Sequence, residues 1–107
     1  MNTIINLTPH PVTICDCDGN IYKTFPLSET PARLEAKTEH VEGINEIPIT
    51  RTVYGKSYNL PEPTEGTYYI VSQMVLNALR REDLLVPSEV VRDAEGNIIG
   101  CKSLGRI

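Results

Sequence analysis

The stretch Gly66-Thr67-Tyr68-Tyr69-Ile70-Val71-Ser72-Gln73-Met74-Val75-Leu76-Asn77-Ala78-Leu79-Arg80-Arg81 joins a strand pattern to a helix pattern. Residues 68–71 are aromatic or β-branched, which favours a pleated strand. The hydroxyl of Ser72 can accept from the free N–H groups of a helix's first turn. After Ser72 the apolar spacing becomes helical, with a stripe made of Met74, Val75, Ala78 and Leu79. The sequence therefore predicts a strand running directly into a helix.

The predicted helix has a polar second face that ends in Arg80 and Arg81. Two arginines in the last turn suit the negative end of the helix dipole. A helix of about two to three turns is too short to persist alone in water. It is therefore expected to lie on a sheet.

Length and composition predict one soluble globular domain over residues 1–107. Apolar residues make up 40% and charged residues 22% of the 107-residue chain, both ordinary for such a domain. The net charge of −4 argues against broad nucleic-acid binding, which needs a basic face.

The expected compartment is the cytoplasm, without membrane association. No apolar run approaches the roughly 20 residues that span a bilayer. The N-terminal residues lack the pattern of a secretion signal. Three cysteines, an odd number, fit a reducing environment.

Strand patterns alternate with turn signals along the rest of the chain. The first strand is expected over residues 3–7, followed by a hairpin over 12–25 that turns at Asp18-Gly19-Asn20. A half-exposed strand over 32–38, a polar loop tip over 39–45 and a strand over 47–54 come next. Residues 55–66 form the longest irregular stretch, and residues 88–103 form a closing hairpin.

The two predicted hairpin turns have similar sequences. Asp16-Cys17-Asp18-Gly19-Asn20-Ile21 resembles Asp93-Ala94-Glu95-Gly96-Asn97-Ile98, which predicts the same turn chemistry used twice. Together these elements predict an α+β domain: a compact, mainly antiparallel, barrel-like or bent sheet with one short helix. The exposed edges of many short strands predict a homo-oligomer.

The candidate binding residues are those that can hold an anion or stack on a base. Ser72 and the N–H groups of Gln73 and Met74 form an anion-friendly helix start. Tyrosines 54, 58, 68 and 69 offer ring faces, and cations offer phosphate contacts. The alternative is that Ser72 is only a cap and the tyrosines are core or rim residues. The predicted ligand-binding set is His10, Arg51, Tyr54, Lys56, Tyr69, Ser72, Gln73 and Arg106.

His10 is the most notable single residue, because two prolines stiffen its loop and imidazole exchanges protons near neutral pH. Its alternative role is to fill a strand entry. No motif specifies a reaction: a Gly-x-Ser-x-Gly elbow, a phosphate-binding loop and His-Glu-x-x-His are missing. No catalytic residue or cofactor is assigned, and an enzyme is not favoured.

Metal sites are not favoured either. Counted from Asp16, a calcium loop would need ligands where Ile21 and Leu27 stand. Cys15 and Cys17 form only one close pair, and a structural zinc site usually has two. Small buried cysteines are the preferred interpretation.

Three segments of the chain stand out as motifs: Asn6-Leu7-Thr8-Pro9-His10-Pro11-Val12, Gly66-Thr67-Tyr68-Tyr69-Ile70-Val71-Ser72, and the run from Arg92-Asp93 through Gly100-Cys101. In this order they resemble a group of small phage, prophage and bacterial proteins of unassigned function. The resemblance implies a phage setting in the host cytoplasm. It makes antagonism of host-defence signalling, including capture of cyclic nucleotides, an expected role.

The sequence is compatible with three functions. The first is non-enzymatic binding of a small anionic, nucleotide-like ligand, which needs a pocket with converging polar groups. The second is a protein-interaction module that inhibits or adapts a host protein, which needs a large exposed apolar patch. The third is a small hydrolase using His10, which needs His10 beside an acid or thiol in a cleft.

Overall fold

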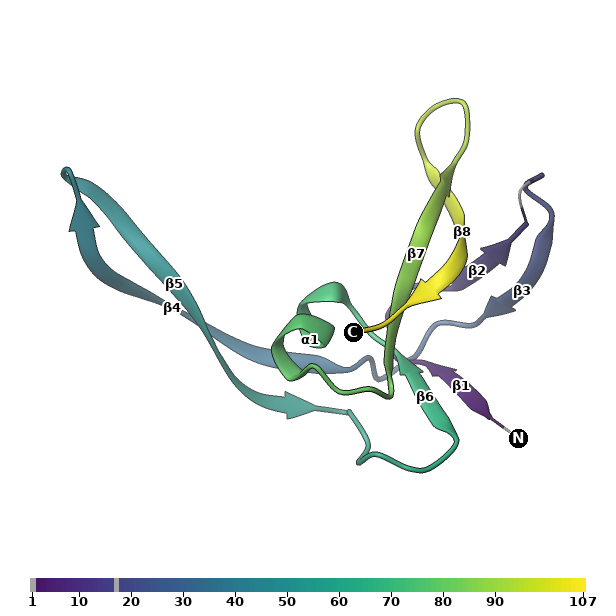
Figure 1. Cartoon of the computed structure of the whole chain (residues 1–107), viewed down its shortest axis with the longest axis horizontal. Helices are drawn as coiled ribbons and strands as arrows, with labels where there is room; N and C mark the ends of the chain where they lie inside the picture. Colours follow the sequence, from purple (N-terminus) through teal and green to yellow (C-terminus); the bar gives the residue numbers. More distant parts are fainter. Residues whose placement is uncertain (1, 17) are drawn as a thin grey trace.

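The computed structural model describes residues 2–16 and 18–107. The elements in chain order are β1 (Thr3–Asn6), β2 (Val12–Cys15), β3 (Ile21–Phe25), β4 (Arg33–Ile44), β5 (Ile47–Tyr58), β6 (Thr67–Ile70), α1 (Gln73–Leu79), β7 (Leu84–Arg92) and β8 (Ile98–Gly105). Six strands and the helix form a body, and β4 and β5 form an arm that projects from it (Figure 1).

The body is built on a six-stranded sheet with the order β1-β6-β7-β8-β2-β3. The pairs β1–β6, β6–β7 and β8–β2 are parallel, whereas β7–β8 and β2–β3 are antiparallel. The α+β class agrees with the prediction, but the body sheet is mixed instead of mainly antiparallel. The reason is that β1 and β6 pair across a long connection, and α1 then crosses from β6 to the parallel β7. The sheet is bent and does not close into a barrel.

The strand-to-helix segment forms as predicted and packs on the sheet. The hydroxyl of Ser72 caps α1 by accepting from the N–H of Val75 at 3.3 Å. Val75 and Leu76 are buried, whereas Met74 is 44% exposed, so the packed stripe differs from the predicted one. The buried cluster on this side of the sheet consists of Leu7, Leu34, Tyr69, Val71, Val75, Leu76, Leu84 and Val86.

The helix ends earlier than predicted. Arg80 takes a left-handed conformation with φ 50° and closes the helix through its N–H to the carbonyl of Leu76. Arg81 therefore lies outside the helix, where it pairs with Asp83 at 2.6 Å. That contact raises the pKa of Arg81 above its usual value, so the second arginine anchors the loop instead of the last helical turn.

A second cluster covers the other face of the sheet. Its buried members are Val12, Ile70, Leu85 and Cys101, with further apolar side chains packed against them. Neighbouring residues of β6 thus enter different clusters, Tyr69 on the helix side and Ile70 on the opposite side. A strand covered on both faces explains why residues 68–71 are a continuous apolar run instead of an alternating one.

The two similar turns have the same geometry. The N–H of Asp16 donates to the carbonyl of Asn20 at 2.9 Å, and the N–H of Asp93 donates to the carbonyl of Asn97 at the same distance. In each turn the aspartate Oδ1 accepts from the N–H groups two and four residues later, at 2.9–3.0 Å. The bond from Asn20 is the main cause of the lowered pKa of Asp16. The prediction of one turn chemistry used twice is confirmed.

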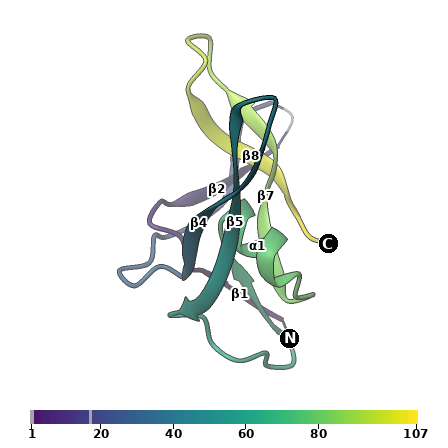
Figure 2. The same cartoon turned by 90° about the vertical axis from the view of Figure 1, so that its left-hand side faces the viewer.

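The β4–β5 arm is longer than the sequence patterns predicted. The predicted loop over 39–45 is wrong, because β4 continues to Ile44 and the turn is Asn45-Glu46, with φ 50° and 68°. A two-residue turn with both central residues at positive φ matches the twist of the flanking strands. Likewise β5 continues to Tyr58, which shortens the irregular segment predicted over 55–66. The two strands twist around each other along the arm (Figure 1 and Figure 2).

Candidate functional site

The edge strands of the bent sheet, β1 and β3, are joined by a side chain instead of a backbone ladder. Asn6 is 6% exposed at the end of β1. Its Nδ2 donates to the carbonyl of Phe25 at 3.3 Å and of Pro26 at 3.1 Å, at the end of β3. It also donates to the His10 carbonyl at 2.8 Å, and its Oδ1 accepts from the N–H and hydroxyl of Thr8. Asn6 therefore holds the carboxyl ends of the two edge strands together.

A cavity of about 510 Å³ opens between β1 and β3 on the same side as the second cluster. Its floor is apolar and comes from three parts of the sheet: Ile4 of β1, Ile14 and Phe25 of the β2–β3 hairpin, and Leu104 of β8. The volume lies within the usual range for small-ligand pockets, about 300–1,000 Å³. The bend of the sheet thus produces a hollow that a flat sheet would lack.

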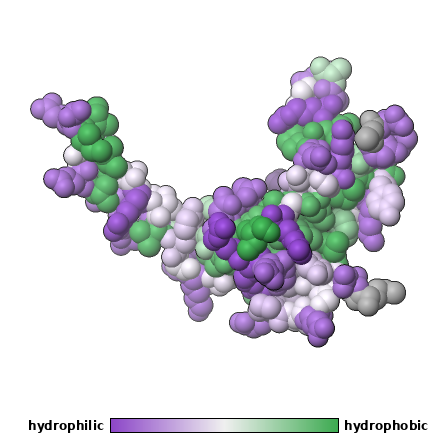
Figure 3. Space-filling view, viewed as in Figure 1, coloured by the Kyte–Doolittle hydropathy of each residue, from purple (hydrophilic) through white to green (hydrophobic). Residues whose placement is uncertain are grey.

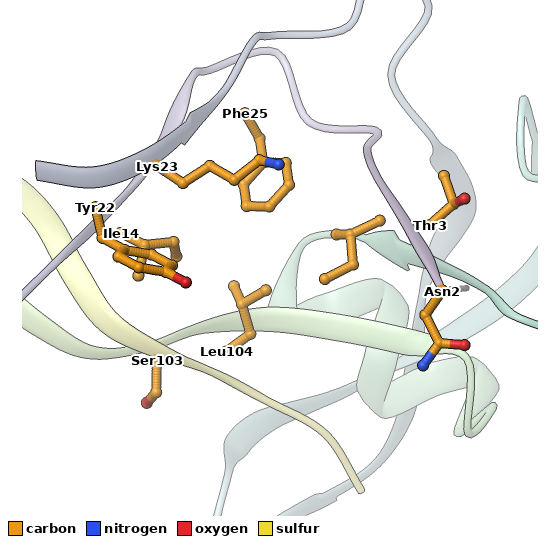
Figure 4. A pocket seen from close by; sticks show the side chains of 9 residues that line it. Asn2, Thr3, Ile14, Tyr22, Lys23, Phe25, Ser103 and Leu104 are labelled. Atoms are coloured by element: carbon orange, nitrogen blue, oxygen red, sulfur yellow. The ribbon is translucent and has the colours of Figure 1, made fainter.

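Polar groups surround this apolar floor. They are Asn2 and Thr3 from β1 and its N-terminal side, Tyr22 and Lys23 from β3, and Ser103 from β8. Tyr22 is 83% exposed, and the ammonium of Lys23 lies 5.3 Å from the centre of the Phe25 ring (Figure 4). The hydroxyl of Ser103 is already engaged with Glu89 at 3.0 Å. An apolar floor with one cation and an exposed aromatic ring suits a flat molecule that carries a negative charge.

The residues predicted to bind a ligand are distributed over separate parts of the molecule. Arg51, Tyr54 and Lys56 all lie on β5 in the arm, away from the helix start. The guanidinium of Arg51 is paired with Glu39 of β4 at 3.2 Å. Lys56 lies 5.9 Å from the ring centre of Tyr58 on the same strand. These side chains are exposed on a hairpin and do not line the cavity between β1 and β3.

The other predicted residues also lie apart. Tyr69 is 4% exposed in the helix-side cluster, so its ring is not open to a ligand. Ser72 caps α1, and the Gln73 amide donates to Asn77 at 2.9 Å. Arg106 lines a different, more polar hollow with Glu82 and Asp83.

His10 lies on the surface in the loop after β1. Within the described part of the chain, His10 takes part in two side-chain hydrogen bonds, and both are accepted by its backbone carbonyl, from Asn6 and Thr8. The motif Asn6-Leu7-Thr8-Pro9-His10 therefore has a structural use, in which the Asn6 side chain folds the loop back.

Sequence reasoning missed the cavity residues Tyr22, Lys23 and Phe25. The strand that carries them was predicted correctly, and an aromatic–cation–aromatic pattern was present in it. The pattern cannot show that Asn6, at the end of β1, lies beside Phe25, which is nineteen residues later in the chain.

The cysteines that the structure describes are buried. Cys15 and Cys101 are free thiols, and burial raises the pKa of Cys101 above its usual value. Over residues 2–16 and 18–107, no three His, Cys, Asp or Glu side chains gather as a metal site would require. Cys17, which entered the predicted cysteine pair, lies outside the described residues.

No protein-family model, curated protein or solved structure matches this chain. The resemblance to phage proteins therefore stays an expectation from three motifs. Among the residues that the structure describes, no helix has the length and apolar character needed to cross a membrane.

Proposed function

We propose that this protein binds a small anionic, nucleotide-like ligand without catalysing its conversion, and that the cavity between β1 and β3 is the binding site. The observation that carries the proposal is the meeting of an apolar floor with Lys23 and the exposed Tyr22 ring in one hollow. The floor and the aromatic ring suit a base, and the ammonium suits a phosphate. Sequestration of a host-defence signal in the cytoplasm of a phage-infected cell is the setting that the motif resemblance suggests.

The hydrolase alternative receives no comparable support. General acid–base work needs a group within hydrogen-bond reach of the reacting proton inside a cleft. Among the described residues, the exposed His10 ring forms no hydrogen bond or ion pair with an acid or a thiol. Binding without turnover therefore accounts better for the features of this site.

Replacing Lys23 with glutamine is the direct test. Calorimetric titration of the parent with a panel of linear and cyclic nucleotides is expected to identify at least one that binds. Lys23→Gln should weaken that binding about three- to tenfold, since the lost charge contact is partly exposed to water. The loss should shrink at high salt, because salt screens the same contact in the parent.

Lys102→Gln is the matched control, because Lys102 is an exposed lysine of β8 that does not line the cavity. Both variants change the net charge equally. Arg51→Ala and Ser72→Ala test the residues predicted from sequence, and binding should survive both changes. Failure of every nucleotide to bind, or equal weakening by Lys23→Gln and Lys102→Gln, would contradict the proposal.

A further inference from the structure

The molecule has more surface than a monomer of its mass normally exposes. An 11.9 kDa globular monomer is expected to expose about 5,900 Å², whereas this chain exposes 7767 Å². Its radius of gyration is 16.8 Å, against about 13 Å for a compact chain of this length. A stable interface removes about 800 Å² from each partner. The exposed surface in excess of the expected value, about 1,800 Å² per chain, is thus large enough for a stable interface.

The β4–β5 arm accounts for the extended shape (Figure 1), in which the longest axis spans 51 Å. It is a two-stranded sheet that enters the core only at its base, through Leu34. Two-stranded hairpins are at best marginally stable in water without packing on a further element. The arm has two strands of 12 residues each. We therefore expect a further element to pack on it in the functional state of the protein.

Apolar residues lie along the arm instead of being restricted to its base. The register places Val41 opposite Ile49, and Ile44 opposite Ile47 at the tip. Ile44 and Ile47 are 61% and 60% exposed. Figure 3 shows hydrophobic residues among hydrophilic ones along the outer arm. Such exposed apolar surface is typical of an interaction site.

The two edges of the arm differ in their ability to accept another strand. The β5 sequence contains Pro48, which has no N–H to donate and disfavours pairing along that edge. The β4 sequence contains no proline over its 12 residues. The β4 edge is therefore the better place for another strand to add.

The charges of β4 complement a second copy of the same strand. If two β4 strands pair antiparallel with Thr38 on the two-fold axis, Lys37 of each copy lies opposite Glu39 of the other, and Ala36 lies opposite His40. Lys37 and Glu39 share one face of the strand, so both charge pairs form on that face. The Glu39–Arg51 pair within each arm extends the row. Opposite charges directly across two strands stabilise the pairing.

We propose that the arm is an assembly element, in which β4 pairs antiparallel with β4 of a second copy about Thr38 and forms a four-stranded sheet across the dimer. This pairing satisfies the open backbone edge of each β4 strand. It is independent of whether the cavity between β1 and β3 binds a ligand.

Charge reversal tests the proposed register. Sedimentation equilibrium of the full chain at low salt should give twice the 11.9 kDa chain mass at high protein concentration. Lys37→Glu and Glu39→Lys should each weaken self-association at least about tenfold, since both symmetric pairs become repulsive. An equimolar mixture of the two variants should restore the dimer, because each copy then meets an opposite charge at both positions.

Lys102→Glu is the control, because it changes the net charge by the same amount as Lys37→Glu, at an exposed position of the body. Circular dichroism should show that all variants remain folded, because the arm positions changed are solvent-facing or half-buried. A parent that stays monomeric at every concentration would overturn the proposal. A dimer that neither arm variant weakens, or that Lys102→Glu weakens as much, would overturn it too. A mixture that fails to reassociate would rule out the register centred on Thr38.

Discussion

Asn6→Ala is expected to lower the free energy of unfolding by about 3–5 kcal/mol. The two Nδ2 hydrogens of Asn6 serve the carbonyls of His10, Phe25 and Pro26, at 2.8–3.3 Å. Alanine cannot donate to any of them, and it also removes the acceptor for both Thr8 donors. Five hydrogen bonds are lost at once, and each contributes about 0.5–1.5 kcal/mol to stability. The total free energy of unfolding of a small domain is about 5–15 kcal/mol, so the variant should lose a large part of its stability.

Urea titration followed by circular dichroism measures this effect as a lower midpoint with an unchanged slope. Asn77→Ala is the matched control, because Asn77 is an exposed asparagine. Among the described residues, its side chain forms one hydrogen bond, which it accepts from the exposed Gln73. It should stay within about 0.5 kcal/mol of the parent, as surface substitutions generally do. If Asn6→Ala were as stable as Asn77→Ala, the edge strands would not depend on the Asn6 side chain.

Gly100→Ala is expected to destabilise the body by about 2–3 kcal/mol, the usual range for overpacking. A Cβ at this position would lie 2.9 Å from the backbone oxygen of Thr13 and still closer to the Cys15 sulfur. The neighbouring Cys101 is paired in parallel with Ile14 of β2, so β8 cannot move away without disturbing that pairing. The glycine therefore permits the close approach of β8 to β2.

Gly105→Ala provides the comparison on the same strand. A Cβ there would meet nothing closer than 3.5 Å, an ordinary contact. Gly105→Ala should leave the free energy of unfolding nearly unchanged. Alanine lowers the conformational entropy of the unfolded chain, and this gain in stability offsets a small packing change. Thermal unfolding of both variants under identical conditions measures the difference. Equal melting temperatures would show that β8 and β2 are less tightly apposed than the structure has them.

Local sequence patterns predicted the elements whose partners are close in the chain. The strand and helix of residues 66–81, the hairpin over 12–25 and the paired aspartate turns all depend on neighbours within a few residues. Spacing, capping and turn chemistry act at that range. The polar run over residues 39–45 predicts a loop, although β4 continues to Ile44, because polarity alone does not distinguish a loop from a strand exposed on both faces.

The candidate site depended on contacts that no local pattern contains. Residues predicted to converge on a ligand, such as Arg51 and Ser72, lie on the arm and at the helix start. The cavity instead combines β1, β2, β3 and β8, whose residues are separated by as many as 101 positions, from Thr3 to Leu104. A side chain's chemistry is visible in the sequence, but its neighbours depend on how the sheet bends.

By itself the sequence determined the α+β class, the strand-to-helix unit, the N-cap at Ser72 and the two aspartate turns, because those depend on short-range sterics and hydrogen bonding. Only the tertiary structure decided that the sheet is mixed, that Asn6 joins its two edges, and that β4 and β5 extend into an arm. The physical reason is that strand order and curvature are decided by which apolar faces can be buried together. Strand order therefore depends on contacts along the whole chain, such as the pairing of Thr3 with Thr67, which are too far apart in sequence for a local pattern to predict.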